Sequence, residues 1–385
     1  MANAMAARGH DVTVLTTCAR RLDDWRNEMA EGQGTLEDIR LVRFRVAHSG
    51  LPRVAKTAGA LMTLHPAAGL VWSNAVGPVS VGYRRHLDRL GHLFDAVFFC
   101  GAWGYLVTEG VRRVRNAVLC PPPCDDPTRK HGHAKALLRA ARAVAVATPD
   151  ERDLLTAQTG HAWRCPTFLV GACPEPPGKE RRRGARLVDG PYLVQVGPHG
   201  PSTEHLLESF RFFRDAHGST SFEDDDGGWF EGRDVRLVLA GDFAHPHQPN
   251  AGVLALGPVD DENRALLVQQ SLGYVHADPS VRIPAGLLEA WTLGKATLVR
   301  GKSAVLAPIL ERAGGEYTYD SPPTFASSAA SMLSRRDPRS AFGARAAEIC
   351  RRLFSQAKLA SALEDVVRGA VGRATGVISE LPPAA

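Results

Sequence analysis

Short apolar runs alternate with amphipathic segments along almost the whole chain, and this alternation limits the fold more than any other feature. Runs such as residues 143–148 and 235–241 have almost no polar side chains, which is typical of strands in a parallel sheet covered by helices on both faces. The pattern predicts an α/β protein built of doubly wound, Rossmann-like sheets. The expected strands are residues 11–17, 39–46, 95–100, 116–122, 143–148, 192–197, 235–241, 253–257, 273–278 and 296–301.

A change of composition divides the chain into two parts. Residues 175–190 are rich in proline, glycine and charge and lack an apolar period, so we expect a linker there. A chain of 385 residues also suits two domains better than one core. The expected domains are residues 1–174 and 191–345, followed by a helical region and tail at 346–385. Open α/β sheets bind ligands at the carboxyl ends of their strands, so the expected site is a cleft between the two sheets.

Charge and hydropathy exclude several classes of protein. The formal net charge of +5 is spread along the sequence, with one dense basic run at residues 181–186, so nucleic acid is not an expected partner. No stretch approaches the roughly 18–20 apolar residues that a membrane helix requires, and a cytoplasmic protein is expected.

Neither the cysteines nor the acidic residues form a metal-binding pattern. Seven cysteines are scattered along the chain, and the close pair Cys120 and Cys124 has no matching Cys or His pair after it. The polar segment 217–234 is interpreted as a solvated loop, with a metal site on its acidic run 223–226 as the alternative, which is disfavoured because adjacent carboxylates repel one another. No metal and no cofactor is therefore expected.

Two segments, "DENRALLVQQS" and "PSVRIPAGLLEAWTLGKATLV", carry a resemblance to a known family. With "RGHDVTVLTTCAR", "AVLCPPPCDDP" and "TPDERDLL" in the expected order before them, the chain resembles the retaining glycosyltransferases of family 4. The resemblance implies the GT-B fold, in which two Rossmann-like domains face each other across a cleft. It also implies that the N-terminal domain binds the acceptor and the C-terminal domain binds a nucleoside-diphosphate sugar, with no obligatory metal.

The resemblance gives Glu289 a role and leaves Val281 without one. Relatives carry two glutamates separated by seven residues, the first facing the donor sugar and the second accepting hydrogen bonds from the ribose. Glu289 stands at the second position, where one carboxylate can accept from both ribose hydroxyls; the alternative is an acid that complements the dipole of its helix. Val281 stands at the first position and can neither accept a sugar hydroxyl nor stabilise a developing oxocarbenium ion.

The cations and the histidine of the family pattern are replaced as well. Relatives grip the diphosphate with an Arg and a Lys after the first strand of the C-terminal domain, where this chain has Pro198 and Thr203. His199 and Arg282 are candidate replacements or surface residues, and Cys124 stands where relatives have a His. The substrate-binding set that the resemblance implies is Gly197, His199, Thr203, Val259, Arg282, Leu287, Leu288 and Glu289.

Two functions of different class fit these residues. One is an active hexosyltransferase in polysaccharide or specialised-metabolite glycosylation, whose acceptor the sequence does not identify. The other is a non-catalytic homologue that binds a nucleotide or supports a partner transferase. A partner transferase and peripheral membrane contact are left open.

The chain begins inside a helical pattern, "ANAMAARGH", that precedes the expected strand at 11–17. Relatives have a strand and a Gly-Gly loop before this helix. We therefore expect the natural reading frame to extend upstream by about 20–30 residues. The alternative is a domain that tolerates the gap.

Overall fold

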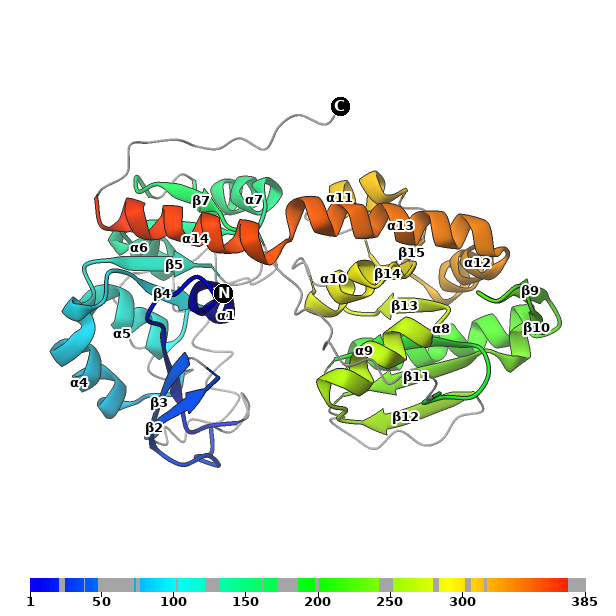
Figure 1. The fold of residues 1–385 in the computed structure, drawn as a ribbon, viewed down its shortest axis with the longest axis horizontal. Helices are drawn as coiled ribbons and strands as arrows, with labels where there is room; N and C mark the ends of the chain where they lie inside the picture. Colours follow the sequence, from blue (N-terminus) through cyan, green and yellow to red (C-terminus); the bar gives the residue numbers. More distant parts are fainter. Residues whose placement is uncertain are drawn as a thin grey trace. The chain divides into compact units, whose positions relative to one another are not determined.

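A computed structural model of the chain separates into two compact units (Figure 1). Unit 1 comprises Met1–Gly171 together with Gln356–Ala385, and unit 2 comprises Ala172–Ser355. No described helix is long and apolar enough to cross a membrane. The structure describes residues 1–20, 25–37, 39–47, 73, 77–101, 103–121, 132–160, 163–171, 186–197, 201–241, 252–279, 284–301, 306–314 and 317–372.

The described residues of unit 2 form a six-stranded sheet in the order β12-β11-β8-β13-β14-β15, with every neighbouring pair parallel. Successive strands are added outward from β8 on one side and then outward from β13 on the other. The order of addition therefore reverses between β8 and β13, which makes that point the topological switch of the sheet. The strands are β8 (Tyr192–Val196), β11 (Arg236–Ala240), β12 (Val253–Gly257), β13 (Gly273–His276), β14 (Thr297–Arg300) and β15 (Thr318–Tyr319).

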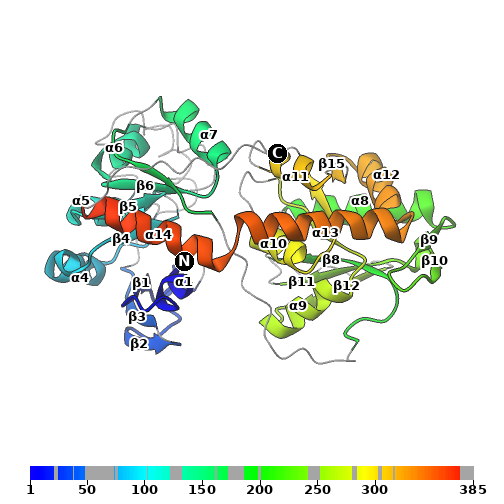
Figure 2. The ribbon, with the colours of Figure 1, turned by 45° about the horizontal axis from the view of Figure 1, so that its top comes forward.

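Helices cover both faces of this sheet (Figures 1 and 2). Helix α8 packs extensively against α12, and α13 packs against α10 and α11. Local signals set the starts of these helices: the Asp260 side chain accepts a hydrogen bond from Asn263 N at 2.8 Å before α9, and Ser321 forms a capping box with Thr324 before α12. The helices are α8 (Pro201–His217), α9 (Asp261–Gln270), α10 (Ala285–Thr292), α11 (Ala307–Ala313), α12 (Pro322–Leu333) and α13 (Arg336–Leu353).

The acidic run 223–226 joins a short hairpin of β9 (Ser221–Glu223) and β10 (Trp229–Glu231) that the sequence did not predict. Asp224 Oδ1 accepts hydrogen bonds from the backbone N atoms of Asp226 and Gly228 at 2.9 and 2.6 Å, which closes the turn.

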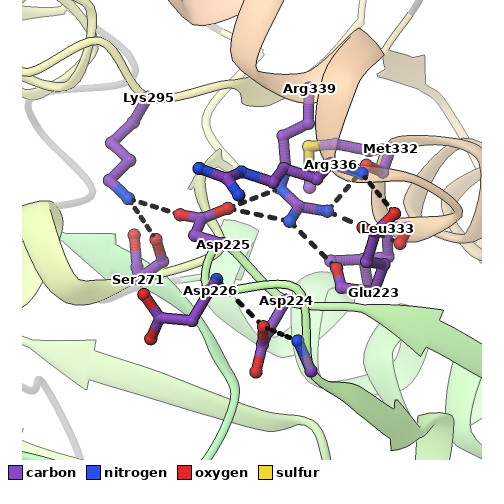
Figure 3. A network of polar contacts seen from close by, with 11 residues as sticks. Glu223, Asp224, Asp225, Asp226, Ser271, Lys295, Met332, Leu333, Arg336 and Arg339 are labelled. Carbon is purple, nitrogen blue, oxygen red and sulfur yellow. Dashed lines mark hydrogen bonds and ion pairs between the residues drawn. The ribbon is translucent and has the colours of Figure 1, made fainter.

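Asp225 ties this turn to the rest of unit 2, as Figure 3 shows. Its carboxylate lies 2.9 Å from Lys295 Nζ and 2.7 Å from an Nη atom of Arg339, a side chain that is only 3% exposed. The turn is exposed at Asp226 and the Asp225 side chain is itself 42% exposed, yet the charge of Asp225 also compensates two cations that come from distant parts of the sequence, which the sequence did not predict.

The described strands of unit 1 fall into two sheets. One has the order β1-β3-β2, with β1 (Thr13–Thr17) parallel and β2 (Gly32–Leu36) antiparallel to β3 (Ile39–Phe44). The sequence predicted parallel strands alone, and it missed β2 because the segment GQGTL is exposed throughout and has no apolar signal. The other sheet is parallel and comprises β4 (Val97–Cys100), β5 (Ala117–Cys120), β6 (Ala143–Val146) and β7 (Thr167–Leu169).

A helix from the end of the chain completes unit 1. This helix, α14 (Gln356–Ala370), packs against α1 (Ala2–Ala6) and against β5, β6 and β7 (Figures 1 and 2). Gly369 lies so close to the Phe168 ring that a Cβ atom there would be 2.4 Å from Cζ. The Glu364 carboxylate also accepts two hydrogen bonds from the Arg8 guanidinium, each at 3.0 Å. The remaining helices of unit 1 are α4 (Val81–Leu90), α5 (Tyr105–Arg113), α6 (Gly132–Ala140) and α7 (Pro149–Thr159), with a 3₁₀ turn η1 (Gly91–Leu93).

Candidate functional site

Three glycines draw the carboxyl ends of β8, β11 and β12 together. Gly197 N donates to Ala240 O at 3.0 Å, and Gly241 N donates to Gly257 O at 2.8 Å. Gly241 has a φ of +134°, and a Cβ atom there would lie 2.0 Å from Gly197 O. Only glycine fits such an approach of two backbones. The described ends of β8, β11 and β12 thus present glycine backbone beside the switch point.

Tyr274 connects this edge to the start of α10. The buried Tyr274 hydroxyl donates to Val196 O at 3.2 Å, directly before Gly197. A Cβ atom at Gly286 would lie 2.4 Å from the same hydroxyl oxygen, so glycine is needed for α10 to pack here. The first turn of α10 is thereby held against the ends of β8 and β13.

Glu289 is one turn further along α10 and forms a buried ion pair. Its carboxylate oxygens lie 3.0 and 3.3 Å from Arg264 Nε of α9, and the residue is 6% exposed. Arg264 also donates through Nη1 to Asp261 Oδ1 at 2.5 Å. A carboxylate at this depth needs a positive partner to offset lost hydration. Each carboxylate oxygen has more than one lone pair and can accept more than one hydrogen bond.

The predicted site residues fall into three groups. Gly197, Thr203, Val259 and Glu289 all lie at the carboxyl edge of the unit 2 sheet: Gly197 follows β8, Thr203 is buried in the first turn of α8, and the half-buried Val259 precedes α9. Leu287 and Leu288 make up the second group. Cys124, His199, Val281 and Arg282 lie outside the described residues.

Leu287 and Leu288 belong to the core rather than to an open surface. Their side chains are 0% and 1% exposed, and both backbone N atoms donate to Pro284 O, at 3.1 and 3.2 Å. Neither the side chains nor these N–H groups are available to a ligand in this arrangement. Their contribution is to hold α10, and with it Glu289, against the sheet.

His276 is a candidate site residue that the sequence did not reveal. It ends β13 at the switch point, is 8% exposed, and its Nε2 atom has no hydrogen-bond partner in the described part of the chain. Burial lowers the pKa of His276 to about 4, against the opposing charge of Asp278. The imidazole is therefore neutral at pH 7 and has an unused polar atom. In the same described part, no three His, Cys, Asp or Glu residues are grouped to hold a metal ion.

Comparison with known proteins finds likeness in structure only. No family model matches the sequence, and no curated protein matches it. Among solved structures, the sucrose-phosphate synthase of Thermosynechococcus elongatus aligns with a TM-score of 0.65 at 13% identity, covering 97% of this chain and 92% of that one. The UDP-forming α,α-trehalose-phosphate synthase of Burkholderia xenovorans, in complex with glucose-6-phosphate, aligns at 0.59 and 8% identity, covering 93% of this chain and 100% of that one.

A third similar structure is the trehalose-6-phosphate protein of E. coli bound with UDP-2-fluoro glucose, with a TM-score of 0.58 and 10% identity over 95% of this chain and 94% of that one.

The chain has the GT-B fold. The fold expected from the sequence is confirmed. At identities of 8–13%, the likeness supports the fold but not the reaction or the roles of single residues. Membership of family 4 and the roles of the individual site residues therefore stay predictions.

Proposed function

We propose that this GT-B chain is a retaining glycosyltransferase of the family 4 kind, which transfers a sugar from a nucleoside-diphosphate sugar to an acceptor. The observation that carries the proposal is the Glu289 carboxylate, held by Arg264 at the carboxyl edge of unit 2 beside the switch point. Binding of UDP-2-fluoro glucose by one similar protein and of glucose-6-phosphate by another supports a UDP-linked donor and a sugar-type acceptor.

The geometry suits the ribose of a nucleotide. A carboxylate is an acceptor only, so it discriminates in favour of a vicinal diol, which offers two donors. Arg264 fixes the carboxylate plane by contacting both oxygens, which lowers the entropy lost when a ligand binds. A Cβ atom at Gly197 would meet nothing within 4 Å in the described part of the chain, which suits an approach of phosphates to the backbone before α8.

A non-catalytic nucleotide-binding homologue is the second candidate, and one observation favours it. Val281 stands where relatives have the sugar-facing acid, which removes a charge from the position where positive charge develops during transfer. Nucleotide binding is common to both candidates, whereas turnover separates them.

Nucleotide binding is expected to depend on Glu289. In Glu289→Ala, the affinity for UDP should fall by about 1.5–3 kcal/mol, or roughly 10- to 150-fold, because a hydrogen-bonded charged acceptor is lost. Isothermal calorimetry on the purified chain measures this, with GDP, TDP and ADP as alternatives for the base. Asp215→Ala is the control, since Asp215 is an exposed acid near the opposite end of α8, away from the first turn. Equal affinities for the wild type and Glu289→Ala would contradict the ribose role.

Turnover decides between the two candidates. Steady release of nucleoside diphosphate from a sugar nucleotide, lost in Glu289→Ala, would establish the transferase. Tight nucleotide binding without release, across UDP-, GDP-, TDP- and ADP-sugars and a panel of sugar acceptors, would favour the non-catalytic homologue.

A further inference from the structure

Arg300, Tyr319 and His205 form a cluster that the candidate site does not use. Arg300 ends β14 and is the register partner of Tyr319 on β15, so both side chains lie on the same face of the sheet. The His205 ring, in the second turn of α8, stacks on the Tyr319 ring at 6.3 Å between centroids and 24° between planes. Arg300 therefore lies on the face of the sheet against which His205 of α8 packs.

The positive charge of Arg300 has no acidic counterpart within the part of the chain that the structure describes. Among the described residues no carboxylate pairs with Arg300, which is half-buried. Burial, and then the charge of Arg300, lower the pKa of His205, which agrees with a short separation between the two side chains. A half-buried guanidinium costs hydration energy unless an anion compensates it, so the arrangement favours a negatively charged ligand.

Other polar groups on the same face also lack partners. The Tyr319 hydroxyl and Gln195 Oε1 have no hydrogen bond within the described part of the chain, although Tyr319 is 1% exposed and Gln195 is 7% exposed. Gln195 is the last residue but one of β8, from which the chain passes into α8. The first turn of α8, a helix of 17 residues, adds N–H groups that the helix itself does not satisfy.

Three other described cations of unit 2 are already paired. Arg264 binds Glu289 and Asp261. Lys295, which precedes β14 and so lies toward the amino edge of the sheet, binds Asp225 together with Arg339. Of the residues that end the six described strands, Arg300 alone is an arginine or lysine, whose charge is permanent at neutral pH.

We propose that Arg300, with the first turn of α8, binds the diphosphate of the donor and thereby supplies the cation that Pro198 and Thr203 do not. The inference rests on the proposed function, and it adds a phosphate-binding residue on a different strand from the one where relatives have theirs. A guanidinium suits this role because it donates two parallel hydrogen bonds to phosphate oxygens and keeps its charge at every physiological pH. It would also stabilise the charge of the departing diphosphate.

The test compares UDP with uridine, which differ only in the diphosphate. Arg300→Gln should weaken UDP binding about 10- to 100-fold, the range for a hydrogen bond to a charged group, and leave uridine binding unchanged in a ligand-observed NMR titration. Arg300→Lys should recover part of the loss, because it restores the charge without the paired donors. Arg236→Gln is the control, since Arg236 begins β11 at the opposite edge of the same sheet.

Each outcome has one meaning for the proposal. UDP binding that resists Arg300→Gln but falls in Glu289→Ala would overturn the role of Arg300 and leave the proposed function standing. An equal loss of UDP and uridine in Arg300→Gln would mean that the residue acts on the fold, and would also overturn it. If Arg300→Gln does not fold, the wild type is tested instead by measuring its affinities for UDP and uridine at rising salt concentration. The ratio of the two affinities should fall as salt rises, because salt screens a contact between charges. A ratio that does not change with salt would contradict a charged contact. Absence of any UDP binding by the wild type would remove the proposed function as well.

Discussion

In Asp225→Ala, the free energy of unfolding of unit 2 should fall by about 3 kcal/mol. Arg339 is almost fully buried, and the loss of Asp225 would leave its guanidinium without a negative partner, although it would still donate to Glu223 O at 2.9 Å. Breaking a buried pair from one side costs about 3–5 kcal/mol, and the 42% exposure of the Asp225 side chain favours the lower end of that range. Urea denaturation followed by circular dichroism measures the change.

Asp226→Ala is the matched control for this experiment. Asp226 is the next residue in the same turn, it is exposed, and its carboxylate points away from Lys295 and Arg339 in Figure 3. Its replacement should change stability by no more than about 0.5 kcal/mol. Equal losses in the two variants would show that the turn, and not the buried charge pair, stabilises unit 2.

The effect of Asp225 should disappear in acid. Burial raises the pKa of Asp225, but the charges and hydrogen bonds of Lys295 and Arg339 outweigh it, so the pKa lies below the ordinary aspartate value. A carboxyl group with a lowered pKa in the folded state contributes stability that is present at neutral pH and is lost as pH falls through that pKa. The stabilities of the wild type and Asp225→Ala should therefore converge below the ordinary aspartate range.

Gly241→Ala should destabilise unit 2 by about 3 kcal/mol or more and weaken UDP binding. The φ of +134° is strained for alanine, and the new methyl group would meet Gly197 O at 2.0 Å. Relief of that overlap would move Gly197, which lies at the candidate site. The two effects are measured by urea denaturation and by calorimetry with UDP.

Gly257→Ala distinguishes strain from overlap. Gly257 also has a positive φ, of +72°, but a Cβ atom there would meet nothing within 4 Å. The free energy of unfolding should therefore fall only by the cost of the backbone conformation, about 1 kcal/mol, and the affinity for UDP should not change. A loss in Gly257→Ala as large as that in Gly241→Ala would contradict the close approach of β8 and β11.

The sheet of unit 2 could be predicted because its strands are buried on both faces. Residues 235–241 were expected as a strand and contain β11, and the helical pattern at 261–271 contains α9. The hairpin of β9 and β10 lies at the surface, where Trp229 is 68% exposed, so its residues have no period that marks a strand. Local patterns also do not reveal that β2 is antiparallel to β3.

The site could be predicted only where spacing along the chain carries the information. Glu289 was identified by its position after Val281, whereas its partner Arg264 lies 25 residues away on another helix. In the sequence, Arg300 and His276 are recognisable only as residues near the ends of expected strands. The uncompensated charge of Arg300 and the unpartnered ring nitrogen of His276 depend on the residues that lie beside them in the sheet. Register and burial are three-dimensional properties that a linear pattern does not contain.

The position of α14 has a consequence for the order in which the protein is made. Unit 1 needs α14 to cover β5, β6 and β7, yet α14 is encoded after the whole of unit 2. A ribosome that adds 5–20 residues per second takes roughly 10–40 seconds to make the approximately 200 residues between Gly171 and Ala370. During that interval α14 is not yet present, and the apolar face of unit 1 that includes Phe168 is exposed. The unit that is synthesised first is therefore the last that can complete its folding.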